Sequence, residues 1–341
     1  MVGGETVLVT GGSGYIGGWC VASLLQRGYV VRTTVRDLSK EPQVRAAVTK
    51  VVDPGNRLSV YAANLTADMG WDAAVNGCDY VLHVASPAVA AEPRDPDELI
   101  VPAREGAKRA VGAAIRAGVK RVVLTSSVAA TSRGEAGDWV GDEAVWTNCD
   151  DPKVGAYGRS KTLAERAAWA LIEAAGGPTT LAVVNPALVL GPVLSSDLSD
   201  SIQVVERMVT GRVPGVPRLG FNVVDVRDVA DLHIRAMTAP EAAGERFIAA
   251  AHWASMADVA DVLRAKLDAK AAAKVPTRKV PDLLVRLIGL FDRDLGSVTP
   301  DLGRKHDYSS TKAQDVLGWR PRPLEETVLD CANSLFAEGV A

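Results

Sequence analysis

The chain has 341 residues, of which 48% are hydrophobic and 23% are charged, and its formal net charge is −3. This length predicts about two domains, and this composition is typical of a globular protein with a large core. No basic stripe is present and no apolar run approaches the roughly 18 residues of a membrane span, which argues against nucleic acid and membrane as partners. The first strand begins by Val7 without a signal-peptide pattern before it, so we expect a cytoplasmic location.

The first predicted element is a short apolar strand over residues 7 to 9, followed by Gly11, Gly14, Gly17 and a helix-like run over 15 to 27. In a strand-turn-helix unit the first glycine permits a sharp turn, and the second lets the backbone approach a pyrophosphate. The third lets the helix pack close to the strand, with its N-terminus facing the phosphate charge. The pattern therefore predicts a dinucleotide-binding loop, with Tyr15 and Ile16 beside the cofactor.

The second predicted strand, residues 30 to 35, ends at Arg36 and Asp37, where a dinucleotide site meets the adenosine ribose. A carboxylate at this point accepts from the ribose 2′-hydroxyl and selects NAD, whereas an arginine accommodates the 2′-phosphate of NADP. Arg36 and Asp37 compete for this role, and Arg32 and Lys40 add positive charge. The pattern favours NADPH and leaves NAD as an alternative.

Further apolar runs alternate with helix-like stretches along the first half of the chain. Strands are predicted over 58 to 61, 80 to 84, 121 to 125 and 180 to 184, and helices over 42 to 51, 98 to 117 and 157 to 175. Strands without polar alternation are typical of a parallel sheet covered on both faces, which predicts an α/β fold with a Rossmann-type doubly wound sheet. The helices at 98 to 117 and 157 to 175 either form the face of a homodimer or are covered within one chain.

After Pro186 the regular alternation gives way to a stretch with many glycines and prolines. We expect an NAD(P)-binding domain over residues 1–187 and a smaller C-terminal α/β substrate-binding domain over 188–221 and 251–341. Residues 222 to 238 have the pattern of a strand feeding a helix, so 222–250 is predicted to return to the first domain. A further helix is predicted over 255 to 273.

The cysteines and histidines do not form a metal-binding pattern. The four cysteines lack any C-x-x-C pair, and His83 lies inside an apolar strand, where a satisfied core residue is more common than a ligand. We therefore expect reduced cysteines and no metal.

The segment from Tyr157 to Lys161 reads Tyr-Gly-Arg-Ser-Lys. A helix advances 3.6 residues per turn, so these two residues lie on one face. A phenol has an ordinary pKa of roughly 10, and an ammonium a few ångströms away lowers a phenol's pKa, which makes general acid-base catalysis feasible near neutral pH. Tyrosine and lysine at this spacing are also common on ordinary surface helices, and the rest of the chain, beginning with the dinucleotide loop, favours the catalytic interpretation.

Together with the glycine loop and this pair, the run Val122-Val-Leu-Thr-Ser-Ser127 resembles the extended short-chain dehydrogenase/reductase superfamily. Shorter segments are similar to the branch of dihydroflavonol 4-reductase, cinnamoyl-CoA reductase and aldehyde reductase. They include His83-Val-Ala-Ser-Pro87, Ser160-Lys-Thr-Leu-Ala-Glu165, Asn185-Pro-Ala-Leu-Val-Leu-Gly-Pro192 and Val224-Asp-Val-Arg-Asp-Val-Ala230.

The resemblance implies an NADPH-dependent carbonyl reductase that interconverts aldehydes or ketones and alcohols, an oxidoreductase acting on the CH–OH group of donors. It places the carbonyl-binding serine at Ser127, with Ser126 as the second candidate. It also implies that Tyr157 is the proton donor and that Lys161 binds the nicotinamide ribose. The remaining cofactor contacts that it implies are Lys40, Asn64, Leu65, Val84, Ala85, Ser86, Thr125, Pro186 and Leu188. Small apolar residues such as Ala85 and Val128 predict a substrate that is at least partly apolar.

Several positions depart from the family pattern. Arg109 stands where many members have a relay asparagine, and Asn64 replaces the usual aspartate near adenine. No asparagine follows Ser127 closely, so flavonoid specificity is not implied. Two alternatives stay open, an NAD-dependent sugar-nucleotide epimerase or dehydratase of the same superfamily and a non-catalytic redox-sensing binding protein.

Overall fold

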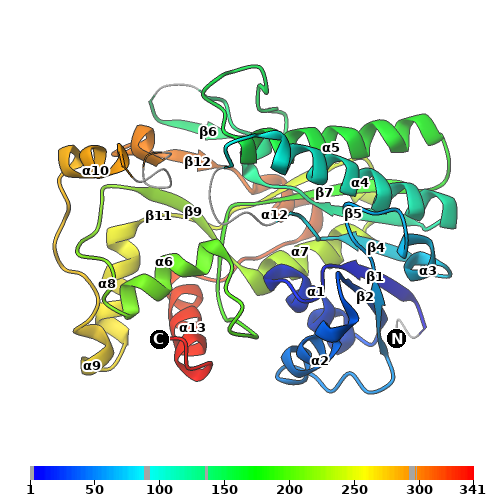
Figure 1. Cartoon of the computed structure of the whole chain (residues 1–341), viewed down its shortest axis with the longest axis horizontal. Helices are drawn as coiled ribbons and strands as arrows, with labels where there is room; N and C mark the ends of the chain where they lie inside the picture. Colours follow the sequence, from blue (N-terminus) through cyan, green and yellow to red (C-terminus); the bar gives the residue numbers. More distant parts are fainter. Residues whose placement is uncertain (1–3, 88–92, 135–136, 292–295, 297) are drawn as a thin grey trace.

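A computed structural model describes residues 4–87, 93–134, 137–291, 296 and 298–341. Its largest layer is a seven-stranded sheet with the strand order β10-β7-β5-β4-β1-β2-β3, and neighbouring strands are parallel (Figure 1). Its strands are β1 (Thr6–Thr10), β2 (Val30–Val35), β3 (Leu58–Ala62), β4 (Tyr80–His83), β5 (Arg121–Thr125), β7 (Thr180–Pro186) and β10 (Arg246–Ala249). The order reverses between β1 and β4, so the loops after these strands flank a crevice at the carboxyl edge.

Valine and leucine dominate the central strands because helices cover both faces of the sheet. Every residue of β5 is buried, and so are all residues of β7 after its first. One face is covered by α1 (Tyr15–Gln26), α2 (Glu41–Thr49), α7 (Val226–Thr238) and α12 (Thr311–Leu317), and the other by α3 (Trp71–Val75), α4 (Asp97–Ala117) and α5 (Ala156–Ala175). The predicted doubly wound α/β fold is confirmed. Helices α4 and α5 pack against each other within the chain.

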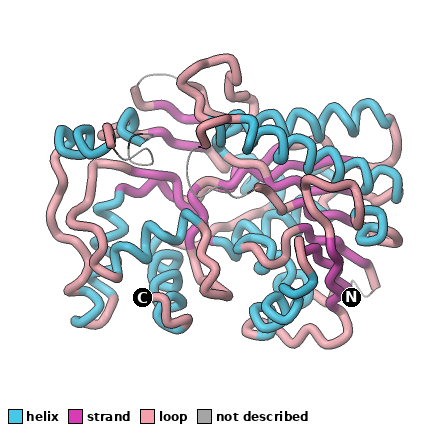
Figure 2. The backbone as a smooth tube through the Cα atoms, viewed as in Figure 1, coloured by secondary structure: helices cyan, strands magenta, loops and turns pink. Residues whose placement is uncertain are grey.

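A second, smaller group of elements is formed by one short strand that precedes β7 and by much of the chain that follows it (Figure 2). A three-stranded sheet contains β8 (Leu188–Leu190), β9 (Gly220–Asp225) and β11 (His252–Ser255), and a two-stranded sheet contains β6 (Trp139–Gly141) and β12 (His306–Tyr308). The helices of this group are α6 (Asp200–Val209), α8 (Met256–Lys266), α9 (Ala269–Ala272), α10 (Asp282–Gly289) and α13 (Leu324–Ala337). Short 3-10 turns are η1 (Leu38–Lys40), η2 (Val128–Ala130), η3 (Pro240–Ala242) and η4 (Thr299–Asp301). Within the described residues, no helix is long and apolar enough to cross a bilayer.

The chain leaves the large sheet after β7 and returns to it through α7 and β10. The predicted strand and helix over 222 to 238 are β9 and α7, but β9 pairs with β8 and β11 in the smaller sheet. The predicted helix-like stretch over 255 to 273 contains α8 and, after its end at Lys266, the short helix α9, whose start Asp268 caps. The domain boundaries themselves stay a prediction.

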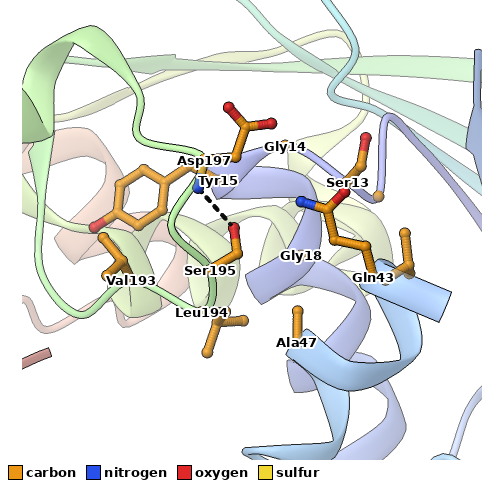
Figure 3. A pocket seen from close by; sticks show the side chains of 12 residues that line it. Ser13, Gly14, Tyr15, Gly18, Gln43, Ala47, Val193, Leu194, Ser195 and Asp197 are labelled. Carbon is orange, nitrogen blue, oxygen red and sulfur yellow. Dashed lines mark hydrogen bonds between the residues drawn. The ribbon is translucent and has the colours of Figure 1, made fainter. Parts of the chain in front are cut away.

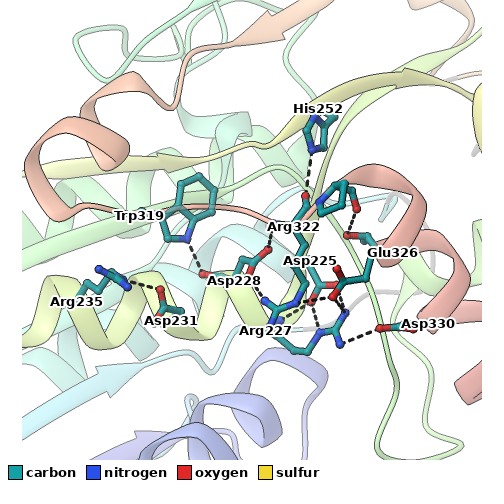
Figure 4. Close-up of polar contacts among 12 residues, drawn as sticks. Asp225, Arg227, Asp228, Asp231, Arg235, His252, Trp319, Arg322, Glu326 and Asp330 are labelled. Atoms are coloured by element: carbon teal, nitrogen blue, oxygen red, sulfur yellow. Dashed lines mark hydrogen bonds and ion pairs between the residues drawn. The ribbon is translucent and has the colours of Figure 1, made fainter.

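A network of charged side chains joins the start of α7 to the C-terminal helix α13 (Figure 4). Arg227 Nη2 lies 2.7 Å from Asp225 Oδ2, and its Nη1 lies 2.8 Å from Asp330 Oδ2. Arg322 pairs with Asp228, whose carboxyl pKa is raised by burial. These contacts tie the last helix to the segment that returns to the large sheet.

Two histidines are fully buried beneath the carboxyl edge of the large sheet. The Thr10 hydroxyl accepts from the backbone N–H groups of Val84 and Ala85, so its own proton goes to His83 Nδ1, at 2.9 Å. His233 Nδ1 donates to the Val229 carbonyl, and its Nε2 lies 2.6 Å from the Thr125 hydroxyl. Burial lowers the pKa of each ring to about 4, and both side chains are therefore neutral core residues at neutral pH.

These histidines predict a loss of stability in mild acid. Between pH 6.5 and about 4 the two histidines are protonated in the unfolded chain but stay neutral in the folded chain. The free energy of unfolding therefore falls as pH decreases. Each histidine contributes at most roughly 1 kcal/mol per pH unit, reached in the middle of this window. Urea unfolding at several pH values measures the slope, and His233→Gln is expected to reduce it by one histidine's share. An unchanged slope in that variant would show that His233 binds its proton over the same pH range in the folded and the unfolded chain.

Candidate active site

The glycine-rich turn follows β1 at the carboxyl edge of the sheet. Gly11 has φ of +75°, a conformation that favours glycine, and Gly14 is the N-cap of α1. A Cβ atom at Gly17 would collide with the Gly11 carbonyl oxygen, and one at Gly12 would collide with the Thr33 hydroxyl. The three predicted glycines thus meet in one turn, and Gly12 is a fourth that the spacing rule did not identify. This close backbone packing fits a pyrophosphate at the N-terminus of α1.

The side chains of α1 hold a second loop against this turn (Figure 3). The Tyr15 hydroxyl donates to the Gly191 carbonyl at 2.8 Å, and Trp19 Nε1 donates to the Pro192 carbonyl at 2.8 Å. Burial raises the pKa of the Tyr15 phenol well above its usual range, and Ile16 packs against the core. The Tyr15 side chain therefore fixes the position of the loop that follows β8. A pocket between the two loops is lined by residues that the sequence analysis missed, among them Ser13, Gln43, Ser195 and Asp197.

Positive charge is exposed at the end of β2. Asp37 Oδ1 accepts from the Ser39 backbone N–H at 2.8 Å and caps η1, which lowers the pKa of that carboxyl. Arg32 is occupied elsewhere, since its Nη1 donates to the carbonyls of Ala74 and Asn76. Arg36 and Lys40 are exposed, and no side-chain hydrogen bond or ion pair to Arg36 is found among the described residues.

The ends of β3 and β4 form the next part of the edge. Asn64 Oδ1 accepts from the backbone N–H and hydroxyl of Thr66, and the Leu65 side chain packs on Gly106 of α4. Arg109, at the position of the relay asparagine, donates to the Leu65 carbonyl and pairs with Asp68. Val84 and Ala85 are held by the Thr10 hydroxyl, and a Cβ at Gly11 would lie 3.1 Å from Ala85 Cα. The predicted residues at these two strand ends therefore line the same edge as the glycine turn.

Tyr157 and Lys161 lie on the first turns of α5, as the helical spacing predicts. Lys161 Nζ is 5.8 Å from the centroid of the Tyr157 ring and donates to Ser86 Oγ at 3.0 Å. The Lys161 residue is 9% exposed, whereas Tyr157 is 46% exposed. The cation thus lies beneath the tyrosine, whose side chain is partly exposed to solvent.

The two neighbouring serines after β5 have different partners. The Ser126 hydroxyl donates to Glu165 Oε2 at 2.6 Å in the buried interior. Ser127 Oγ instead accepts from the Ala129 backbone N–H at 3.1 Å and caps η2, which leaves its own proton free to donate. A Cβ at Gly158, next to Tyr157, would lie 3.6 Å from the Ala129 carbonyl oxygen, so the first turn of α5 lies against the turn that begins with Ser127.

The remaining predicted contacts lie at the ends of β5 and β7. The Thr125 hydroxyl is bonded to His233, Pro186 ends β7, and Leu188 begins β8. One cavity is lined jointly by β4, β5 and α5, through His83, Ser86, Thr125, Ser126, Lys161 and Glu165. Within the described part of the chain, no group of three or more histidine, cysteine or acidic side chains could hold a metal ion.

Comparison with known proteins gives consistent matches over most of the chain. A model of the NAD dependent epimerase/dehydratase family matches residues 7–250. Cinnamoyl-CoA reductase 1 of Petunia hybrida is 36% identical over 99% of this chain and 94% of that protein, and dihydroflavonol 4-reductase of Zea mays is 35% identical over 94% and 85%. The yeast methylglyoxal/isovaleraldehyde reductase Gre2, solved with NADPH, superposes with a TM-score of 0.82 at 26% identity, covering 99% of this chain and 100% of that one.

The glycine turn follows β1, and Lys161 of the tyrosine-lysine pair on α5 reaches Ser86, just after the neighbouring strand β4 of the same doubly wound sheet. This arrangement is that of an NAD(P)H-dependent oxidoreductase. The chain belongs to the NAD dependent epimerase/dehydratase family. The expected superfamily and its branch of dihydroflavonol 4-reductase and cinnamoyl-CoA reductase are confirmed, and NADPH is the cofactor in the solved Gre2 structure.

Proposed function

We propose that the chain reduces aldehydes or ketones to alcohols, reversibly, with NADPH as the hydride source. The observation that carries this proposal is the arrangement at the start of α5. The accessible Tyr157 lies over the buried Lys161, and the helix turn that bears it packs on the turn that Ser127 caps. A phenol, a cation and a hydroxyl with a free proton are the groups that carbonyl reduction needs.

Each side chain then has a separate role. NADPH, when bound, supplies the hydride to the carbonyl carbon. The Ser127 hydroxyl donates a hydrogen bond where negative charge grows on the carbonyl oxygen, and Tyr157 gives that oxygen its proton. Lys161 places its charge beneath the phenol and binds the nicotinamide ribose. Ser126 is unsuited to the carbonyl because its proton already goes to Glu165.

The end of β2 supports NADPH over NADH. Arg36 is exposed, whereas the carboxylate of Asp37 is taken up by the cap of η1. A guanidinium there makes charge-assisted hydrogen bonds to a 2′-phosphate. The same feature argues against the sugar-nucleotide epimerase alternative, since such enzymes favour an acidic residue at this ribose.

The substrate is proposed to be a small molecule that is at least partly apolar. A panel of aldehydes, ketones and β-keto esters, followed by NADPH absorbance with NADH in parallel, tests the function itself. Bound NAD in the purified protein, with no turnover of NADPH on any carbonyl, would favour the epimerase alternative. The cytoplasmic location and a homodimer stay predictions.

Removing the tyrosine hydroxyl tests the proton donor. Tyr157→Phe is expected to lower kcat by about 10²- to 10⁴-fold, the usual contribution of general acid catalysis, because only the proton donor is lost. NADPH binding, measured by fluorescence titration, is expected to change little. Tyr80→Phe is a matched control, because its hydroxyl contacts Glu5 near the start of β4. Full activity in Tyr157→Phe would refute the proposed chemistry.

Removing the arginine at the end of β2 tests the choice of cofactor. Arg36→Ala is expected to weaken NADPH binding by about 10- to 100-fold and NADH binding much less, because a charged hydrogen bond to the phosphate is lost. Arg116→Ala makes the same change in charge at the end of α4, on the opposite edge of the sheet, and serves as the control. Equal losses of affinity for NADPH and NADH would show that Arg36 does not contact the 2′-phosphate.

A further inference from the structure

A buried carboxylate lies directly behind the candidate catalytic residues. Glu165 is on α5, one turn after Lys161, and it is fully buried. Its Oε1 accepts from Arg246 Nε at 2.6 Å, and its Oε2 accepts from Ser126 Oγ at 2.6 Å and Asn185 Nδ2 at 3.1 Å. A buried charge needs such a set of donors, since desolvation of an unpaired carboxylate is costly.

The partners of Glu165 also hold the turn that Ser127 begins. Asn185 Nδ2 donates to the Ser127 carbonyl at 3.1 Å, and Arg246 Nη2 reaches the Ala130 carbonyl at 3.4 Å. Both ends of the turn over residues 127 to 130 are therefore bound by side chains that Glu165 orients. Ser126, the residue before Ser127, adds a third connection because its hydroxyl donates to Glu165.

Arg246 extends this network to the segment that leads into α5. Its Nη1 donates to the carbonyls of Glu143 and Val145, each at 2.8 Å, and its guanidinium carbon lies 3.8 Å from the ring centroid of Trp146. Arg246 is the first residue of β10, so the returning strand delivers the cation that balances Glu165.

We propose that Glu165 is a positioning residue, which fixes the Ser127 hydroxyl relative to Tyr157. Tyr157, Lys161 and Glu165 follow one another at four-residue intervals on α5, and so lie on one face of that helix. The helix that carries the proton donor thereby also anchors the turn that carries the hydrogen-bond donor. A displacement of about 1 Å between reacting groups lowers a rate by roughly 10²-fold, so this anchor acts on kcat.

The proposal rests on the proposed function and is tested by a mutant cycle with Ser127→Ala. Glu165→Gln alone would leave the Arg246 charge buried without its partner, so the main variant is the pair Glu165→Gln/Arg246→Met, which removes both charges. This pair is expected to lower kcat about tenfold or more, with NADPH affinity within about twofold of the native value. In the Ser127→Ala background it is expected to have almost no further effect on the residual kcat, because Ser127 is the group through which it acts.

A control pair and a milder variant keep the test decisive. Glu206→Gln/Arg212→Met removes another ion pair with a buried carboxylate, on and just after α6, and is expected to leave kcat unchanged. Should the main pair fail to fold, Ser126→Ala takes its place in the same cycle, since it removes one hydrogen bond and no charge. Unchanged kcat in the variant that is used would overturn the positioning role. Equal losses of kcat in the native and the Ser127→Ala backgrounds would overturn it as well. A native chain inactive on every carbonyl would instead overturn the proposed function.

Discussion

The parallel pairing of the large sheet determines where the proposed site residues lie. Because all seven strands run in one direction, the loops after β1, β2, β4 and β5 emerge at the same edge. Gly11, Arg36, Ser86 and Ser127 follow those four strands, and α5 begins at that edge. Residues more than 100 positions apart in the sequence therefore lie along one edge of the sheet.

The second constraint is the period of helix α5, which places residues four apart on neighbouring turns of one face. Tyr157 is at the accessible end, Lys161 lies one turn below it, and Glu165 lies one turn further, inside the protein. The three side chains thus lie in order from the solvent to the core along one face of the helix. The lysine and the glutamate have different partners. Ser86 accepts from the lysine, whereas Arg246 from the returning strand balances the carboxylate. The proposed catalytic pair and a buried ion pair of the core are therefore carried by the same helix.

The sequence was sufficient for features that depend on local patterns. The valine runs of β5 and β7, the glycine turn and the spacing of Tyr157 and Lys161 each follow from neighbouring residues. Features that depend on distant partners were not predictable in this way. The resemblance ranked Ser127 before Ser126 as the carbonyl-binding serine, but the physical reason for that order, the hydrogen bond from Ser126 to Glu165, joins residues 39 positions apart. Strand β10 is four residues long, and nothing local indicates that Arg246 would reach Glu165. The role of Asp37 as a cap depends on the turn that follows it.

A crystal structure of the chain with NADPH and an unreactive carbonyl analogue tests the convergence of these groups most directly. The account predicts the carbonyl oxygen within about 2.6 to 3.2 Å of both the Tyr157 and the Ser127 hydroxyl, with Lys161 on the nicotinamide ribose. A carbonyl oxygen bound away from both hydroxyls, in a complex that is active in solution, would contradict it.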